Sequence, residues 1–424
     1  MIMTLIPFIF MPPLMKSLIM VISLLFFVIF ISPTFINNNS FNNISLSEMS
    51  IYMVILTCLI IIMVNMTMVN KKMSNMIMIL TIIMWLFFSE NNLIKFFIWY
   101  EMALIPMFIM ILESGYQPER MKAALNLFFY TALASSPLII SILIWSQEFN
   151  IMFMVNIKYF QISGPIFIFN LALLLSFLVK LPLYMFHLWL PKAHTEAPYF
   201  GSMILAALML KMGSYGLFQF IIFIQPNFMK LLFWICLAFS LIISLIAMTE
   251  TDLKVIIAYS SVAHMAMGLL PILGSFYLSK ISFIISNVAH GFTSSAMFYI
   301  AYILYLKSHT RNLLMNKGFL TNTPVLMLFW FLTLMASAGS PPSINFIGEL
   351  LTIMIAVNWI PYAVLILMLV LMTGTAYNMI IYTQTALMLP SYYMENSSVT
   401  QEQLTTIFLH TLCMFVLVLM MMIM

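Results

Sequence analysis

Long apolar runs follow one another along the whole chain, and only short polar stretches separate them. Most are close to the length of about 20 residues that a helix needs to cross the hydrocarbon core of a bilayer. Because these runs are apolar on every side, they indicate helices surrounded by lipid or by other helices. The apolar segments are 14–35, 51–70, 73–89, 94–112, 122–146, 166–190, 199–225, 229–249, 254–274, 281–306, 324–356, 361–388 and 404–424.

These thirteen segments, with the short apolar stretch Met1–Phe10, predict an all-α membrane protein of about 14 transmembrane helices. Pro12-Pro13 ends the first stretch, which at about 1.5 Å per residue barely crosses a bilayer. Whether the first 13 residues form a full span is therefore left open by the pattern. Loops are short throughout, so residues 1–424 are expected to form one polytopic membrane domain.

Composition supports the same class. Hydrophobic residues make up 64% of the chain and charged residues 7%, against roughly 25% charged residues in soluble domains. So little polar surface cannot cover a soluble core of this size. The spans use nearly the whole chain, which leaves no room for a soluble catalytic domain.

Several kinds of site are not expected. The three cysteines, Cys58, Cys236 and Cys413, are far apart, so they predict neither a disulfide framework nor a bound iron–sulfur cluster. No glycine-rich phosphate loop follows a strand pattern, and the net charge of +4 is spread along the chain, so neither nucleotide nor nucleic acid is an expected ligand. We therefore expect no cofactor and no metal site in this chain.

Methionine is unusually frequent, with 43 residues. An AT-rich genome with an additional methionine codon explains this excess, and animal mitochondria have such genomes. The composition therefore indicates a mitochondrial compartment and says nothing about mechanism.

Basic residues predict the orientation, because loops on the negative side of a membrane carry more Lys and Arg. With the stretch before the first segment counted as loop zero, the even loops hold ten basic residues and the odd loops hold four, Lys158 among the latter. This places the even loops, with Arg120 and Lys122, on the negative side of the membrane, which is the cytoplasm or the mitochondrial matrix. The C-terminus is then on the opposite side. Most charges lie at loop edges, where they are expected to anchor the chain at the interface.

Six ionisable residues lie inside spans instead. Such residues are costly in a membrane and usually have a function. Acids and bases inside a bundle can also pair and merely hold helices together, although Ser, Thr, Asn and small residues are the more usual contacts between membrane helices. The six are Glu101, Lys180, Lys211, His264, His290 and Glu349.

Two of these spans contain helix breakers. Pro182 follows Lys180 by two residues, and Gly339-Ser340-Pro341-Pro342-Ser343 precedes Glu349. Proline removes a backbone donor and clashes with the preceding turn, so both helices are expected to be interrupted. Broken helices beside buried charges in two halves of a chain are typical of transport sites.

Specific motifs surround these residues. The run from Lys180 to Gly216 reads KLPLYMFHLWLPKAHTEAPYFGSMILAALMLKMGSYG. Further motifs are WYEMALIPMF, GYQPER, TDLKVIIAYSSVAHM, AHGFTSSAMF and PPSINFIGEL. Over residues 90 to 390 the chain resembles the antiporter-like membrane subunits of mitochondrial NADH:ubiquinone oxidoreductase (complex I), the chain 4 family in particular. Relatives often have Gly-Gly where this chain has Gly213-Ser214.

The resemblance implies two inverted five-helix repeats, each with a broken helix. The expected division is N-terminal helices in 1–93, a first repeat region in 94–225, a second in 229–388, and a C-terminal helix at 404–424. It also implies that the six residues transfer protons. Glu101 is expected to pair with Lys180, and Lys211 to be the central relay.

His264 and His290 are expected along the connecting polar axis, with Glu349 in the second broken helix. Desolvation and pairing with Glu101 act in opposite directions on the charge of Lys180, so moving the partner away would release a proton. Bridging waters would carry protons across the wider gaps.

The expected function is proton translocation in a translocase whose NADH, flavin, iron–sulfur clusters and ubiquinone belong to partner subunits. Its expected partners are other complex I subunits, especially neighbouring antiporter-like subunits, and membrane lipid, in the mitochondrial inner membrane. Two alternatives remain at this stage. One is a cation/proton antiporter subunit, and the other is a membrane scaffold whose charges are structural.

Overall fold

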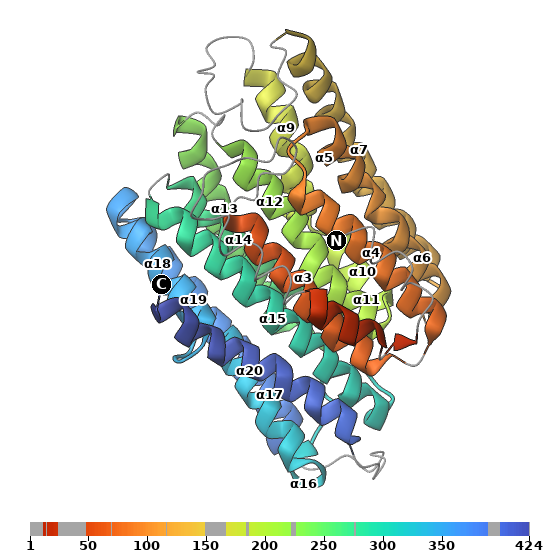
Figure 1. Ribbon diagram of the computed structural model, residues 1–424. Helices are drawn as coiled ribbons and strands as arrows, with labels where there is room; N and C mark the ends of the chain where they lie inside the picture. Colours follow the sequence, from red (N-terminus) through yellow and green to blue (C-terminus); the bar gives the residue numbers. More distant parts are fainter. Residues whose placement is uncertain are drawn as a thin grey trace. The chain divides into compact units, whose positions relative to one another are not determined.

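The computed structural model describes residues 12–13, 15–23, 48–68, 70–115, 117–148, 167–183, 186–221, 226–274, 277–388 and 399–423. The elements in these ranges are helices, and the backbone pairing of Asp252 with Asn312 is an isolated bridge (Figure 1). The chain divides into two compact units. The first comprises Met1–Lys180 and Leu208–Ile224, and the second comprises Leu181–Ala207 and Gln225–Met424.

The first unit is built from seven named helices in its described part, and α9 packs against both α7 and α12. They are α3 (Glu48–Thr67), α4 (Lys71–Ser89), α5 (Leu93–Met102), α6 (Leu104–Ser114), α7 (Arg120–Glu148), α9 (Phe167–Lys180) and α12 (Leu210–Phe220).

The second unit has a longer set of helices, and α14 packs against both α13 and α15. The set is α10 (Trp189–Glu196), α11 (Tyr199–Ile204), α13 (Pro226–Thr249), α14 (Leu253–Leu273), α15 (Tyr277–Ser308), α16 (Phe319–Asn322), α17 (Pro324–Ser337), α18 (Ile344–Trp359), α19 (Ala363–Tyr382) with the π-helical turn η4 (Thr383–Leu387), and α20 (Gln401–Ile423). The π-helical turn η2 (Leu205–Met209) joins α11 to α12, and the boundary between the units falls within it.

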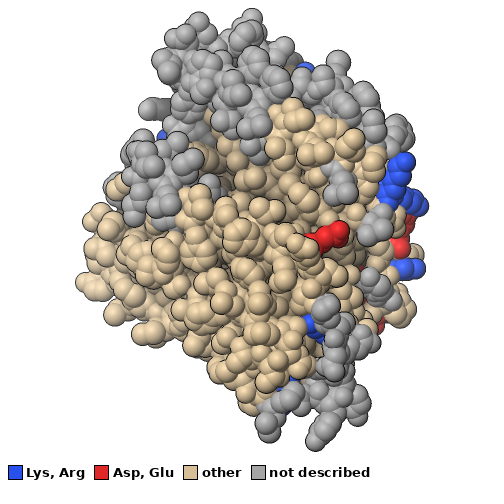
Figure 2. Space-filling model, turned by 60° about the horizontal axis from the view of Figure 1, so that its bottom comes forward, with Lys and Arg blue, Asp and Glu red and all other residues tan. Residues whose placement is uncertain are grey.

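Eight helical runs in the described part of the chain are long and apolar enough to cross a membrane. The broken helices α17 and α18 are apolar but shorter. Figure 2 shows few charged side chains among the described residues on the face in view. The count of about 14 helices stays a prediction, and Met1–Phe10 lies outside the described residues. The repeat boundaries also stay a prediction.

Local chemistry explains where helices begin. The side chains of Asn70 and Asn92 each accept a hydrogen bond from the backbone N–H two residues later, at 3.1 Å in both cases. Asparagine is a favoured N-cap because it satisfies one of the donors that a helix start leaves unpaired. These two caps fix the starts of α4 and α5.

The first expected interruption is confirmed. Helix α9 ends at Lys180, and α10 begins only at Trp189. Pro182 cannot supply the backbone donor that a further turn would need, and it disfavours helical geometry in Leu181. Lys180 therefore lies at the carboxyl end of a helix inside an apolar stretch.

The second interruption is confirmed as well. Helix α17 ends at Ser337 and α18 begins at Ile344, with Gly339 in the left-handed region at φ 68° between them. The freed backbone carbonyls find partners: Ser340 donates its N–H to Met335 O at 3.1 Å, and Asn345 Nδ2 donates to Ala336 O at 2.9 Å. A break at membrane depth persists only when its polar backbone groups are satisfied in this way.

Candidate functional site

In the first unit, Lys180 contacts the residue next to Glu101. Lys180 is buried, with 3% of its surface exposed. Its amine donates a hydrogen bond to Tyr100 O at 3.0 Å and lies 3.1 Å from the centroid of the Tyr100 ring. The Tyr100 hydroxyl in turn donates to Ser176 O at 3.0 Å. An ammonium over an aromatic face is attracted by the ring quadrupole. Tyr100 therefore joins α5 to the end of α9 at the lysine.

The expected direct ion pair between Glu101 and Lys180 is not formed. Glu101 is half-buried, and its Oε1 atom has no hydrogen-bond partner among the described residues. The lysine amine is already held by the carbonyl and the ring of Tyr100. Adjacent helix positions face different directions, so the side chain of Glu101 diverges from that of Tyr100.

Lys211 lies in the first turn of α12, directly after η2, and is fully buried. A π-helical turn inside an α-helix is often found at functional sites. Ser214 donates its hydroxyl to Lys211 O at 3.0 Å. Ser214 therefore has a hydroxyl that is bonded to the backbone of this lysine within its own helix.

Aromatic packing connects the helices that carry the two lysines. Tyr100 packs edge-on against Phe177 of α9, with ring centroids 5.7 Å apart. Tyr215 of α12 donates to Phe88 O at 3.2 Å and packs on Phe87, a ring that also contacts Tyr100. A side chain on Gly216 would overlap Phe177, so this glycine permits α12 to approach α9.

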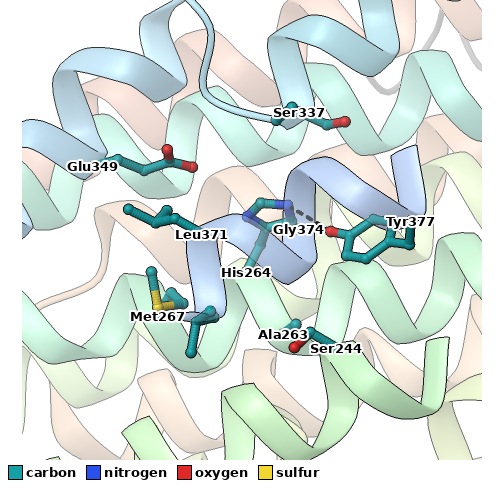
Figure 3. Close-up of a pocket in the computed structure, with 11 residues that line it drawn as sticks. Ser244, Ala263, His264, Met267, Ser337, Glu349, Leu371, Gly374 and Tyr377 are labelled. Atoms are coloured by element: carbon teal, nitrogen blue, oxygen red, sulfur yellow. Dashed lines mark hydrogen bonds between the residues drawn. The ribbon is translucent and has the colours of Figure 1, made fainter. Parts of the chain in front are cut away.

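In the second unit, His264, Tyr377 and Glu349 line one cavity together with Ser337 (Figure 3). His264 Nε2 and the Tyr377 hydroxyl are 3.2 Å apart and form a hydrogen bond, shown as a dashed line in Figure 3. The cavity volume is about 20 Å³, which is enough for a water molecule. A histidine, a phenol and a carboxyl group thus meet around space for water.

His290 is close to this cavity but does not line it. It lies on α15, is 4% exposed, and its ring centroid is 6.0 Å from that of His264. The structure therefore brings the two histidines near each other, and their place along a proton path stays a prediction.

Contacts between helices determine the position of the Glu349 side chain. Ser282 of α15 donates to Gly348 O at 3.2 Å, which holds α18 against α15 at the neighbouring residue. A methyl group on Gly339 would overlap the Glu349 carboxylate. The break between α17 and α18 therefore supplies the space that the carboxylate occupies.

Two lysines expected as interfacial anchors are buried instead. Lys254 is 9% exposed and donates to Ala197 O at 3.0 Å. Lys16 is fully buried and donates to Ser74 Oγ at 3.1 Å. The position of a lysine at a segment edge does not predict the helices that pack over it, and here polar acceptors on other helices replace water.

Sequence reasoning did not select Tyr100, Tyr377 or Gly339. The signals were present: Tyr100 directly precedes Glu101, and Tyr377 belongs to the polar run Thr373-Gly374-Thr375-Ala376-Tyr377-Asn378 inside an apolar span. The sequence pattern predicts Gly339 as part of a helix break but does not indicate its contact with Glu349. Among the described residues, no group of three His, Cys, Asp or Glu side chains is placed to hold a metal ion.

Comparison with known proteins gives the family. Residues 90–374 match the model of the NADH:quinone oxidoreductase/Mrp antiporter membrane family. NADH-ubiquinone oxidoreductase chain 4 of Ceratitis capitata is 39% identical over 312 residues, covering 72% of this chain and 69% of that protein. The chain 4 protein of Scyliorhinus canicula is 38% identical over 341 residues, covering 78% and 74%.

The fold of this chain is also similar to that of one chain in a solved complex. A chain of respiratory complex I from Thermus thermophilus, solved with bound NADH, superimposes with a TM-score of 0.82 at 21% identity, covering 88% of this chain and 81% of that one. The resemblance inferred from the sequence motifs is thereby confirmed. The chain belongs to the NADH:quinone oxidoreductase/Mrp antiporter membrane family and, within it, to the NADH-ubiquinone oxidoreductase chain 4 family.

Proposed function

We propose that this chain is a core membrane-arm subunit of a respiratory NADH:ubiquinone oxidoreductase, and that it translocates protons across the mitochondrial inner membrane. The observation that carries the proposal is the placement of ionisable groups inside apolar spans beside two helix breaks, the buried Lys180 at the first and the half-buried Glu349 at the second. NADH, flavin, iron–sulfur clusters and ubiquinone are assigned to partner subunits. Other complex I subunits and membrane lipid surround the chain.

Lys180 is proposed to load and release a proton. Removal from water penalises the ammonium, whereas the Tyr100 carbonyl, the Tyr100 ring and a neighbouring carboxylate stabilise it. A movement of the free end of α9 changes this balance without moving the rest of the helix. Electron transfer in the partner subunits would supply the energy for that movement.

The relay is proposed to run from Lys180 to Lys211, then to His264, with His290 beside it, and to end at Glu349. The step from Lys211 to His264 rests on the sequence resemblance alone. From His264 to Glu349 the proton would cross the small cavity through a bound water molecule. The hydrogen bond between the Tyr377 hydroxyl and His264 Nε2 holds the His264 ring, which lines that cavity.

The test is proton movement by the assembled complex in native membranes, measured together with rotenone-sensitive NADH:quinone turnover. Tightly coupled proton translocation that depends on the buried groups supports the proposal. Sodium-dependent transport by the reconstituted chain alone, without NADH, would instead favour the cation/proton antiporter alternative suggested by the breadth of the family.

Replacing Tyr377 with phenylalanine is expected to slow proton translocation by about two- to tenfold. The ring is retained, but the hydrogen bond to His264 is lost, which is worth about 0.5–1.5 kcal/mol. The measurement is the rate of NADH-driven proton translocation. Tyr362→Phe is the matched control, because Tyr362 is 82% exposed; equal rates in the two variants would remove Tyr377 from the relay.

Cysteines introduced in place of Lys122 and Lys158 are expected to be labelled from opposite sides of the membrane, Lys122→Cys from the matrix side. The reason is the asymmetry of basic residues between loops. Lys122 is exposed near the start of α7, whose 29 residues are long enough to cross the bilayer. Lys158 lies outside the described residues. Labelling of both cysteines from one side would contradict the topology.

A further inference from the structure

Asn378 is a buried residue whose side-chain amide has no hydrogen-bond partner among the described residues. It lies on α19 directly after Tyr377, is 2% exposed, and neither Oδ1 nor Nδ2 has a hydrogen-bond partner among the described residues. A buried amide left unpaired costs about 1–3 kcal/mol for each such group. The side chain therefore needs a molecule that both donates and accepts hydrogen bonds.

Asn378 lines a second cavity, with a volume of about 250 Å³, at the break between α17 and α18. Because a water molecule occupies about 30 Å³ in the liquid, several fit. The residues at the break, Ala338, Gly339 and Ser340, line it on one side, and Tyr382 is also part of its wall. Ala338 lines the first cavity too, so the two cavities share the residues of the break.

The chemical groups that line the second cavity indicate which molecule it can hold. Its described residues offer an amide, two hydroxyl-bearing side chains at Ser340 and Thr375, and a phenol at Tyr382, and none of them is charged. A metal ion or a phosphate would lack charged partners among these residues, whereas water supplies both the donor and the acceptor that the Asn378 amide needs.

We propose that this second cavity holds a cluster of water molecules anchored on Asn378, and that the cluster continues the proton path from Glu349 past the helix break. The proposal rests on the proton-translocating function above. In this step the O–H bond of protonated Glu349 breaks and an O–H bond forms on a water. That water passes one of its own protons along the cluster, and the Glu349 carboxylate is reprotonated from the His264 side, so no atom is gained or lost.

Position supports this order. The carboxylate of Glu349 fills the space beside Gly339, and Gly339 also lines the second cavity. No side chain stands between them at this position, because glycine has none. Glu349 thus lines the first cavity and lies beside Gly339, a residue that lines the second.

The first measurement is a high-resolution map of the assembled complex, which is expected to show ordered water within hydrogen-bond distance of both Asn378 Oδ1 and Nδ2. The second is proton translocation by Asn378→Leu, expected to fall about tenfold, the equivalent of about 1.4 kcal/mol. Asn378→Ser, which retains a group that binds water, is expected to recover most of the loss. Asn358→Leu is the matched control, since Asn358 is an exposed asparagine on α18.

A map with a lipid chain or another subunit's side chain against Asn378 would overturn the proposal. Translocation by Asn378→Leu at the rate of Asn358→Leu would overturn it as well. If Lys180→Ala stops translocation while Asn378→Leu does not, the water site fails and the proposed function stands; if both variants translocate normally, the proposed function fails. Should Asn378→Leu not assemble, the map of the unaltered complex decides.

Discussion

Replacing Lys180 with alanine is expected to stop proton translocation while the complex still assembles. Lys180 is 3% exposed, and its amine is bonded to Tyr100 O rather than to a carboxylate, so its removal leaves no buried partner charge stranded by a broken ion pair. Glu101 remains and can become neutral by taking up a proton. Neither alanine nor a neutral carboxyl group supplies the exchangeable base, and loss of such a group lowers rates by about 10²-fold or more.

The measurement is the ratio of protons translocated to NADH oxidised in membranes that contain the variant. Lys180→Arg is expected to be nearly as poor, since a guanidinium does not release its proton at working pH. Lys72→Ala is the matched control: Lys72 is 66% exposed and forms a surface pair with Glu113 at 2.8 Å, a kind of contact worth about 0–1 kcal/mol. Normal translocation by the Lys180→Ala variant would mean that Lys180 has a structural role and does not transfer protons.

Replacing Gly339 with alanine is expected to be nearly as damaging, although the change adds one methyl group. The methyl would overlap the Glu349 carboxylate, and the residue is at φ 68°, where a side chain costs about 1–2 kcal/mol. The carboxylate must move away, so it loses its position beside the two cavities. We expect proton translocation to fall at least about tenfold, the effect of about 1.4 kcal/mol on a barrier.

Gly318→Ala is the control for this variant. Gly318 is also in the left-handed region, at φ 75°, but it is not among the residues that line either cavity, so this variant is expected to keep most of its translocation per complex. Both variants are compared for the amount of assembled complex and for translocation per complex. If Gly339→Ala lowers only the amount of complex, the glycine serves folding and the position of Glu349 is not sensitive to it.

The helix breaks were predictable because their cause is local. Pro182 and the Pro341-Pro342 pair act on the turns directly before them, so no knowledge of neighbouring helices is needed. The same reasoning found Lys180 and Glu349, because a charge in an apolar span is visible in the sequence itself. Membership of an all-α membrane class followed from the length of the apolar runs alone.

Contacts between helices were less predictable. The amine of Lys180 was expected at Glu101 but bonds to Tyr100, one residue away, because helix rotation decides which of two adjacent positions faces a neighbour. The contact of Gly339 with Glu349 depends on how the chain folds back across a break, which residue spacing does not encode. The burial of Lys254 is hidden for the same reason, since its acceptor, Ala197 O, is distant in sequence.

The position of the Lys180 amine over the Tyr100 ring has a consequence for spectroscopy. Tyrosine absorbs in the near ultraviolet, and a unit charge 3.1 Å from the ring centroid shifts that absorption when the charge appears or disappears. Each protonation or deprotonation of Lys180 is therefore expected to change the absorption spectrum of Tyr100, a chromophore that the chain already contains. A time-resolved difference spectrum, with Tyr100→Phe as the blank, would follow the lysine during turnover without any attached dye.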